Sequence, residues 1–507
     1  MKGSTAFWIV LLVCAGLAGA QERVLFLSLD EAIDLALEES YEARRQYLQL
    51  RRAEQSRAAA VARSRLNVSL QLDAPDFNER VQEVRLPNEL PSYNTVGSLE
   101  WGGRANITQS LPTGGGLTFS PHFRRLRDSV FDEGLQSTEK DKTFFSSFSL
   151  TLRQPLFVPN QRKLSLERSK LQLEQAQRSY TRTQLDLVYT VTQEFYSYYQ
   201  AVRAEGIARQ GSKQQESSYD LASKKFAAGL IPEGDVLQME VDLDQSRNAL
   251  LEAEGALTRQ ADRFKLTLGL RMEDEVSVAT EFVVREFEVD EARAIAHGLE
   301  HRADIRESEI SRHLAGIALR EADAQTAIRG DVTAFYDRTG VSDPALSASS
   351  TTRQLFDSSW DNLQDRPENF GVQFNLTVPL FDSGLNRAQV GVAQAALEQS
   401  ELSVAHRERQ VRQQIRATIA QLREARNRLD VLKKSEAVAR RNYQISLSRF
   451  DNGDITSQEL ALDQNRLTGV LESYLRAYIQ YQLAIADLKR QTLYDFEQDR
   501  SLVGGVN

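Results

Sequence analysis

Cysteine is almost absent from this chain of 507 residues. The one cysteine, Cys14, lies inside an N-terminal apolar run, so the rest of the chain can form no disulfide, thiolate metal site or thiol nucleophile. Lipidation of Cys14 would need a small preceding residue, and Val13 is not small. Histidine is scarce as well, and only His297 and His301 have a metal-capable helical spacing. They lie in a charged helix without a thiol, so we expect no metal and no cofactor.

Long apolar runs and catalytic motifs are also missing. Beyond residue 20 no run approaches the ~18 apolar residues that a membrane-spanning helix needs. The chain contains no nucleophile elbow, P-loop or dinucleotide fingerprint, so these enzyme classes are not indicated. The formal net charge of −9, with no block of like charges, argues against a nucleic-acid partner. We therefore expect a protein that is not an enzyme.

The N-terminus has the pattern of a secretory signal. Lys2 precedes an apolar run at residues 6–17, and Ala18-Gly19-Ala20 provides an A-x-A cleavage site. We expect residues 1–20 to be a signal peptide. An exported chain without a spanning helix is either soluble or crosses a membrane as strands.

Six segments alternate apolar and polar residues with the period of two that is typical of β-strands. In the clearest, residues 369–379, every second residue from Phe370 to Val378 is apolar, and those between are Gly, Gln, Asn or Thr. The others lie near residues 66–73, 104–111, 116–124, 144–154 and 331–337. The glycine triplet at 114–116 predicts a hairpin turn, because it lacks the Lys-Ser/Thr and the helix of a phosphate-binding loop. We expect one polar loop that runs to about residue 103, a second that ends near residue 144, and a third at about 338–368.

Elsewhere the apolar period changes to three and four residues, as in helices that pack as coiled coils. A capping box from Ser28 to Glu31 begins a helix that we expect to run to about Arg65. Further helices are predicted at about 159–225, 235–268, 291–327, 385–449 and 457–491, with short strands at 24–27 and 276–284.

The order of these elements occurs twice. A Pro-Leu-Phe triplet joins strand to long helix at residues 155–157 and again at 379–381, and the offset of 224 residues persists to the ends of the helices. There Phe226, Gly229 and Ile231 match Phe450, Gly453 and Ile455. This indicates an internal duplication. The predicted parts are a first repeat at 21–270, an equatorial linker at 271–292, a second repeat at 293–493 and a C-terminal tail at 494–507.

Each predicted strand has one apolar and one polar face, which suits either a soluble sandwich of two sheets or a membrane barrel with lipid outside and a wet lumen. The secretory signal, the long polar loops at one end of the strands and the aromatic residues at strand ends favour the barrel. Both ends of each strand region join helices, so the number of strands in each must be even. We count four strands in the first repeat and two in the second. Six strands are too few for a membrane barrel, and open strand edges are not tolerated in lipid. Several copies must then share one barrel.

These features resemble the outer-membrane efflux proteins of the TolC type. The resemblance rests on the SLDEAIDLAL opening, the two strand–Pro-Leu-Phe–helix junctions, the two Phe-x-x-Gly tips and the duplication. It implies an α+β membrane protein, a homotrimer whose transmembrane β-barrel in outer-membrane lipid is continued by a long α-helical coiled-coil tunnel across the periplasm. Residues 22–27, 270–292 and 494–507 would supply an equatorial collar. The chain would be a passive duct of a tripartite efflux or type I secretion system, with an inner-membrane pump.

The resemblance also assigns roles to residues. The tips would contact a periplasmic adaptor, or membrane fusion protein, through Phe226, Gly229, Ile231, Phe450, Gly453 and Ile455. Acidic residues after the tips, namely Asp235, Glu459 and Asp463, would line the periplasmic pore entrance, and Asp235 and Glu459 can equally serve as helix-dipole partners. The sequence departs from the family at Leu462, where a second acid is expected, and at Ile455, where a basic latch residue is expected. Pro155, Phe157, Pro379 and Phe381 would mark the strand-to-helix junctions.

Two alternatives remain beside the channel. One is a soluble periplasmic helical-hairpin adaptor or interaction protein, although adaptors usually carry one long hairpin rather than a duplicated pair. The other is a secreted enzyme with a coiled-coil stalk, for which the chain offers no catalytic constellation. Drug efflux, metal efflux and protein secretion are equally compatible with the sequence. Six strands per copy predict an eighteen-stranded barrel in a trimer, against the family's usual twelve.

Overall fold

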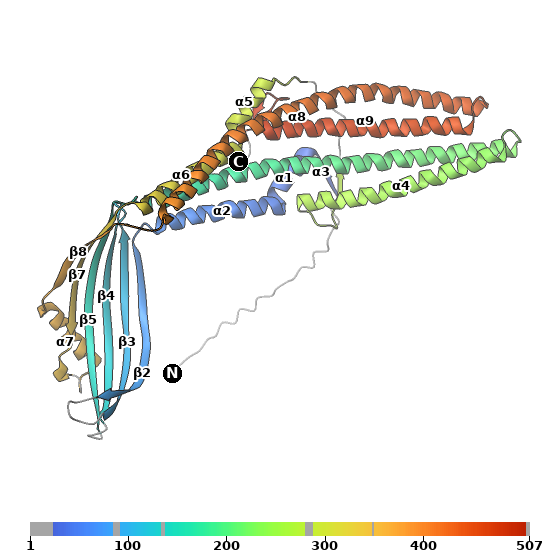
Figure 1. Cartoon of the computed structure of the whole chain (residues 1–507). Coiled ribbons are helices and arrows are strands. Elements are labelled where there is room, and N and C mark those ends of the chain that lie inside the picture. The colour runs from blue at the N-terminus through green and yellow to red at the C-terminus, as the bar shows by residue number, and fades with distance from the viewer. Residues whose placement is uncertain (1–23, 85–91, 133–136, 279–286, 347–348, 503–507) are drawn as a thin grey trace, which may run out of the picture. The chain divides into compact units, whose positions relative to one another are not determined.

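The computed structural model describes residues 24–84, 92–132, 137–278, 287–346 and 349–502 (Figure 1). The predicted signal peptide lies outside these residues. Within them, no helix is long and apolar enough to cross a membrane. The chain divides into two compact units. A sheet unit comprises residues 49–179 and 304–407, and a hairpin unit comprises the described parts of residues 1–48, 180–303 and 408–507.

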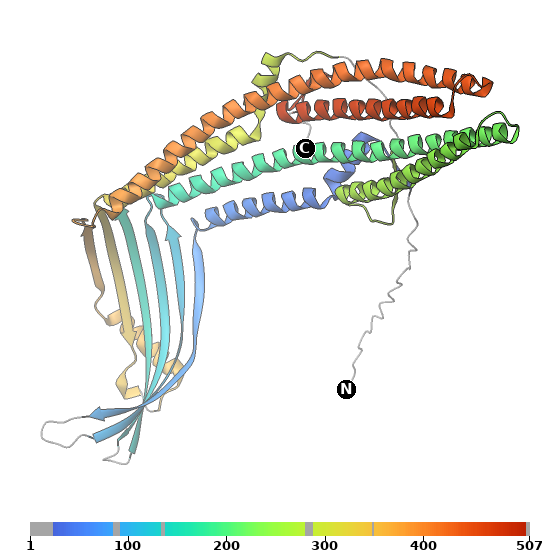
Figure 2. The ribbon, with the colours of Figure 1, turned by 45° about the vertical axis from the view of Figure 1, so that its right-hand side comes forward.

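The sheet unit contains one antiparallel sheet of six strands in the order β2-β3-β4-β5-β7-β8 (Figure 2). The strands are β2 (Asn67–Val84), β3 (Ser92–Ser110), β4 (Gly116–Asp132), β5 (Ser137–Leu156), β7 (Arg329–Val341) and β8 (Asn369–Thr377). The predicted count of four strands from the first repeat and two from the second is confirmed. The hairpin at residues 104–124 belongs to this sheet, and β2 and β8 are its two edges.

The strands β2, β3, β4 and β5 extend far beyond their predicted ends. The prediction of two polar loops, one before residue 103 and one before residue 144, is therefore wrong. The pairing of β2 with β3 continues out to Val84↔Ser92. The pairing of β4 with β5 continues out to Asp132↔Ser137. Charged and polar side chains do not end a strand here, because the ladder hydrogen bonds satisfy the main chain whatever side chain it carries.

The prediction of a loop at about 338–368 is also wrong, because this segment contains the helix α7 (Thr352–Asp365) and a short 3-10 helix, η1 (Pro344–Leu346). α7 begins with a capping box in which Thr351 Oγ1 accepts a hydrogen bond from the backbone N–H of Gln354. Its buried residues, Leu355, Ser359 and Leu363, recur at helical spacing and pack on the sheet. The capping box and this spacing were the signal that sequence reasoning missed.

The two faces of the sheet differ in polarity. Paired residues across β4, β5, β7 and β8 form an apolar row of Phe119, Leu150, Tyr336 and Phe370. Phe370 is 77% exposed. The adjacent row on the opposite face is polar and consists of Ser120, Ser149, Asp337 and Asn369.

The helical part of the sheet unit comes from α2 (Tyr41–Ala62), α3 (Gln161–Ala227), α6 (Ala303–Thr326) and α8 (Leu385–Asn452). Three ion pairs join α3 to α6, and the longest, between Arg320 and Glu167, spans 3.8 Å. The distance from Arg306 Nε to Glu174 Oε1 is 2.7 Å, and the distance from Arg168 Nη2 to Glu321 Oε2 is 2.5 Å. The hydrogen bond from Arg306 lowers the pKa of Glu174 below its ordinary value.

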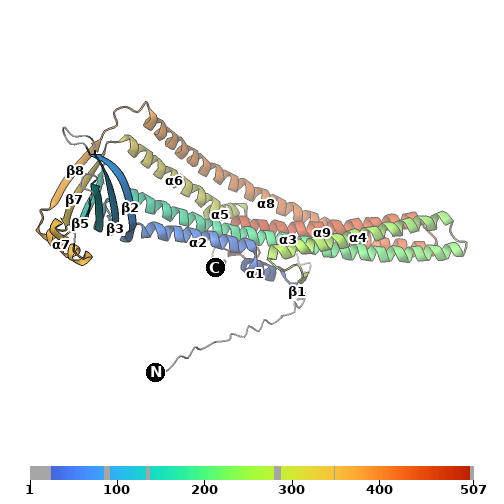
Figure 3. The ribbon, with the colours of Figure 1, turned by 90° about the horizontal axis from the view of Figure 1, so that it is seen from below.

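The hairpin unit contains two helical hairpins, α3–α4 and α8–α9, which lie side by side (Figures 1 and 3). α4 spans Glu233–Leu268 and α9 spans Ser457–Thr492. The ring pairs Phe195–Phe264 and Tyr196–Tyr478 lie in its core, with centroids 6.0 Å and 6.3 Å apart. The predicted first strand is β1 (Val24–Leu27), which pairs in parallel with β6 (Glu275–Val278). A second small sheet consists of β9 (Tyr494–Asp495) and β10 (Arg500–Ser501).

Two helices that were predicted to be continuous are each interrupted. α1 (Leu29–Glu39) is separated from α2 at Ser40, and α5 (Glu291–His301) is separated from α6 at Arg302. Both break residues have extended backbones, with ψ of 145° and 127°. Ser40 Oγ accepts a hydrogen bond from the N–H of Ala43 at 3.1 Å, so side-chain capping competes with helix continuation. The breaks fall at corresponding places in the two repeats, as a duplication predicts.

Candidate functional site

The two helical tips have the same backbone turn. In the first, Gly229 has a φ of +75°, its N–H donates to the carbonyl of Phe226 at 2.8 Å, and the N–H of Leu230 donates to Lys225 at 2.9 Å. The second tip makes the same two bonds 224 residues later, around Gly453 with a φ of +86°. This is a Schellman arrangement, in which a glycine takes the left-handed conformation and the last carbonyls of the helix gain donors.

The side chains of the tips differ. Phe226 is 43% exposed and Leu230 is 71% exposed, so the first tip presents apolar surface. Phe450 of the second tip is only 2% exposed. Lys225 Nζ lies 4.6 Å from the centroid of the Phe450 ring and donates hydrogen bonds to the carbonyls of Phe450 and Asp451. A cation from the first hairpin therefore covers the aromatic ring of the second.

Phe450 belongs to a buried cluster that joins the two hairpins. Ile231 and Ile455 pack against this cluster and are partly buried. Among the predicted adaptor-contact residues, Phe226 is thus the one with an open apolar side chain. The members of the cluster are Ala222, Met239, Ala439, Tyr443, Phe450, Leu460 and Leu467.

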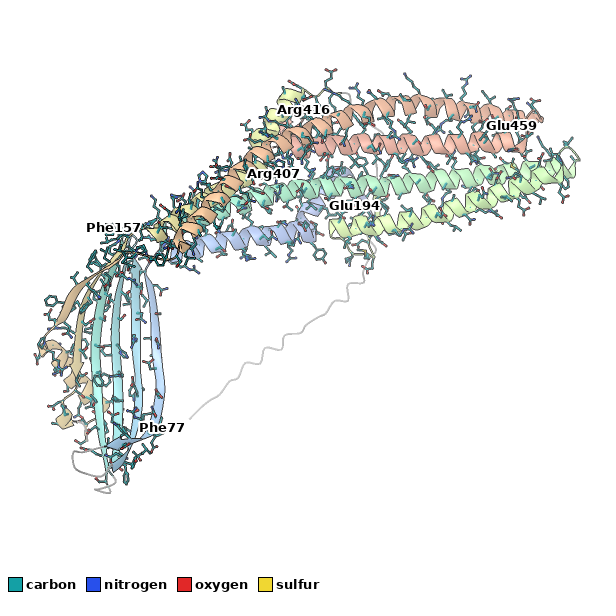
Figure 4. The ribbon with its side chains drawn as sticks, viewed as in Figure 1. Phe77, Phe157, Glu194, Arg407, Arg416 and Glu459 are labelled. Atoms are coloured by element: carbon teal, nitrogen blue, oxygen red, sulfur yellow. The ribbon has the colours of Figure 1, made fainter. Side chains whose placement is uncertain are left out.

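The predicted pore-entrance acids have distinct surroundings. Glu459, at the start of α9, completes a capping box with Thr456, whose N–H donates to Glu459 Oε2 at 3.1 Å (Figure 4). Asp463 accepts a hydrogen bond from Ser446 Oγ of α8 at 2.6 Å. Asp235 lies in the first turn of α4, where a negative charge favours the helix dipole.

A polar network that sequence reasoning did not identify connects α3, α8 and α9. Asp487 accepts hydrogen bonds from Thr418 at 3.0 Å and from Gln491 at 2.7 Å, and its other oxygen pairs with Arg490 at 2.7 Å. Arg490 also pairs with Asp186 of α3 at 2.8 Å. The available signal was an acid and a base three residues apart on one helix, a spacing at which opposite charges pair.

The Pro-Leu-Phe triplets lie where strand gives way to helix. Pro155 pairs with Asp331 near the end of β5, and Pro379 lies two residues beyond the last residue of β8. Phe157 has a positive φ of 64°, and both it and Phe381 are exposed (Figure 4). Each strand-to-helix junction therefore carries one exposed aromatic side chain.

Side-chain caps stabilise the N-termini of the two long helices, α3 and α8. Asn160 Oδ1 accepts from the N–H of Lys163 at 3.0 Å at the start of α3. At the start of α8, the N–H groups of Asn386 and Gly384 each donate to Asp382 at 2.9 Å. These backbone hydrogen bonds lower the pKa of Asp382, since they favour its charged form.

The histidine pair packs as aromatic rings. His297 stacks on Tyr494 with centroids 4.5 Å apart, and on His301 at 5.9 Å. In the part of the chain that the structure describes, no group of three His, Cys, Asp or Glu residues could hold a metal ion.

Comparisons with known proteins agree with these features. The outer membrane efflux protein family matches residues 125–270 and 295–492. Protein CyaE of Bordetella pertussis (strain Tohama I) is 25% identical over 265 residues, and the chain spans about half the length of this relative, 50% of each protein. The CmeC outer membrane channel of Campylobacter jejuni is 13% identical, with 100% of this chain and 96% of CmeC covered and a TM-score of 0.68. The outer membrane protein VceC of Vibrio cholerae is 14% identical, with 92% and 95% covered and a TM-score of 0.63.

The likeness to solved structures shows the fold, which is that of outer membrane channels. The family match extends over most of both repeats, and it confirms the predicted efflux protein over the adaptor and enzyme alternatives. The chain belongs to the outer membrane efflux protein family.

Proposed function

We propose that three copies of this chain form a passive channel in the outer membrane, through which an inner-membrane pump exports its substrate. The sheets of the three copies form the membrane barrel, and the helical hairpins form a tunnel in the periplasm. Residues 22–27, 270–292 and 494–507 supply a collar around the tunnel, and a periplasmic adaptor contacts the tips.

The apolar face of the sheet is the observation that carries this proposal. On the two edge strands, β2 and β8, this face exposes Val68, Leu70, Leu72, Phe370, Val372, Phe374 and Leu376. Exposed apolar surface of this extent marks an interaction surface. Burial in a hydrocarbon environment favours such a patch by about 25 cal/mol per Å². Lipid supplies that environment, and the polar opposite face suits a water-filled lumen.

The open edges support the oligomer. Six strands are fewer than the roughly eight of the smallest membrane barrels, and an unpaired edge in lipid leaves backbone groups without partners. Pairing of β8 in one copy with β2 in the next removes every edge in a closed ring. A trimer then has an eighteen-stranded barrel.

A matched pair of substitutions on β8 tests the channel. Phe374 and Gln373 are neighbours that point to opposite faces of the sheet. Phe374→Arg places a charge in lipid, which costs about 2–4 kcal/mol at the bilayer midplane, whereas Gln373→Arg places it in the lumen. We expect Phe374→Arg to lose membrane insertion and Gln373→Arg to keep it, as measured by cell fractionation and native mass spectrometry of the detergent-extracted trimer. A wild-type chain that stays soluble without detergent, or that is monomeric, would contradict the proposal.

A further inference from the structure

An apolar hollow lies on the lipid-facing side of the sheet, beside α7. It has a volume of about 490 Å³, and its walls include Leu72, Trp101, Gly103, Phe123 and Phe144. The pairings Leu72↔Gly103↔Phe123 and Trp101↔Arg125↔Phe144 put these residues on one face of β2 to β5. Gly103 lacks a side chain between larger neighbours, and a Cβ there would approach Leu72 to 3.2 Å. The hollow is therefore a gap in the apolar face.

Helix α7 forms an aromatic wall at the same level. Trp360 lies over Phe123 and Phe148, with ring centroids 6.4 Å and 5.7 Å apart. Ser359 Oγ lies 2.7 Å from Ser146 Oγ, and a Cβ at Gly340 would lie 2.0 Å from the Ser359 carbonyl, so the close approach requires glycine. α7 therefore packs firmly against the lipid-facing side.

The charges on the outer face of α7 and the length of β5 indicate how deep in the membrane the hollow lies. This face carries the charged residues Arg353, Asp357 and Asp361, which do not belong in hydrocarbon. Phe144 lies about 12 residues from the end of β5 at Leu156, or roughly 40 Å along the strand at ~3.3 Å per residue. With a strand tilt of about 40°, the vertical distance is roughly 30 Å, close to the ~25 Å apolar band of a membrane barrel. The hollow therefore lies at the headgroup level of the leaflet farther from the helices.

Arg125 supplies a cation at this hollow. Its guanidinium carbon lies 5.6 Å from the centroid of the Trp101 ring, and its Nε is buried without a hydrogen-bond partner among the described residues. Arg127 lies two residues further on the same strand and is exposed. Two carboxylates lie nearby. Asp73, which also lines the hollow, lies 3.9 Å from His122 Nε2, and Glu100 lies 3.5 Å from Arg124 Nη1. A guanidinium whose Nε has no hydrogen-bond partner among the described residues, beside an apolar hollow, matches a phosphate attached to an acyl chain.

We propose that this hollow binds a phosphate-bearing lipid of the distal leaflet, with an acyl chain against Gly103 and Trp101 and the phosphate on Arg125. The inference rests on the proposed membrane barrel. Trp101 and Trp360 are the tryptophans beyond the predicted signal peptide, so fluorescence reports on this region. The processed full chain is reconstituted in vesicles that contain phosphatidylglycerol or phosphatidylcholine with the same dibrominated acyl chains. We expect tryptophan quenching at about fivefold lower mole fraction of the phosphatidylglycerol, because one basic residue contributes about a factor of five near an anionic lipid surface.

Substitutions separate the headgroup from the acyl chain. Arg125→Gln should abolish the preference for phosphatidylglycerol, Arg125→Lys should keep most of it, and Arg353→Gln, whose side chain is 92% exposed on the outer face of α7, should keep all of it. Excess soluble glycerol phosphate should not compete. Equal quenching by both lipids in the inserted wild type, an unchanged preference in Arg125→Gln, or competition by glycerol phosphate would overturn the lipid site and leave the channel intact. Absence of quenching by either lipid would show that the chain does not insert and would overturn both proposals.

Discussion

The two helical tips share one backbone turn and differ in what they expose. The first tip presents Phe226 and Leu230, whereas the second buries Phe450 beneath Lys225 of the first. The main-chain bonds depend on glycines that both repeats keep, and the side chains depend on which helices lie beside them. A duplicated hairpin inside one chain therefore need not have two equivalent ends. We infer that the second tip stabilises the pair and the first offers the apolar contact.

Truncation of the two phenylalanines is the strongest test of this difference. Phe450→Ala removes a buried ring and should cost about 3–5 kcal/mol of stability, while Phe226→Ala should cost less than about 1 kcal/mol. Hydrogen exchange in the α8–α9 tip and thermal unfolding of the purified protein measure these effects. In pull-down with the proposed periplasmic adaptor, we expect the order to reverse, with the larger loss for Phe226→Ala. Equal destabilisation by the two variants would contradict the assignment, and Phe450→Leu, which keeps most of the volume, serves as a control.

Replacement of Lys225 should produce the next largest effect. Lys225→Met keeps the aliphatic stem but removes the donor to the Phe450 and Asp451 carbonyls and the cation over the ring. Hydrogen bonds from charged groups contribute about 1.5–3 kcal/mol, so we expect a loss of about 1–3 kcal/mol in chemical unfolding. Arg449→Met, at the corresponding position of the second repeat, should change stability by less than about 0.5 kcal/mol. A comparable loss from both would show that the two tips are equivalent after all.

Substitution of the tip glycines should test the backbone turn that the two tips share. Gly229 and Gly453 both have positive φ, and a Cβ at either would meet no atom within 4 Å. Alanine at each should therefore cost only the backbone strain, about 1–2 kcal/mol, and the two values should agree within about 0.5 kcal/mol. Thermal unfolding of the two single variants measures this. A much larger cost at one position would mean that the turns differ in more than their side chains.

The backbone turns of the two tips could be predicted from the sequence, whereas the burial of their side chains could not. The offset of 224 residues, the Pro-Leu-Phe triplets and the glycines predicted the duplication and the tips, and the period of two predicted the six strands. These features were predictable because backbone conformation follows local residue type. The burial of Phe450 and the exposure of Phe226 have no local signal. Both follow the same helix pattern, and only the packing of the neighbouring hairpin distinguishes them.

The wrong predictions in the sheet unit, namely the strand lengths and the absence of α7, have a similar origin. The distal halves of β2 to β5 are rich in charged residues and read locally as loops, yet each strand is held by hydrogen bonds to its neighbours. α7 was missed because a Ser- and Asp-rich composition outweighed its capping box and apolar spacing. Long-range pairing therefore decided the strand lengths, and tertiary packing made a helix of the expected loop.

The smallest stability effect should come from Glu459→Gln, and it separates two roles of one carboxylate. Glutamine can keep the reciprocal hydrogen bond of the capping box with Thr456, so only the charge at the helix N-terminus is lost, about 0.3–1 kcal/mol. If Glu459 also lines the pore entrance, the cation-to-anion permeability ratio of the reconstituted trimer should fall, as measured from reversal potentials across a salt gradient. Thr456→Ala provides the opposite pattern, because it loses the cap, costs about 1 kcal/mol and keeps the charge. An unchanged permeability ratio in Glu459→Gln would leave this residue a helix cap alone, since a carboxylate at the narrow end of a conducting pore has to influence which ions enter it.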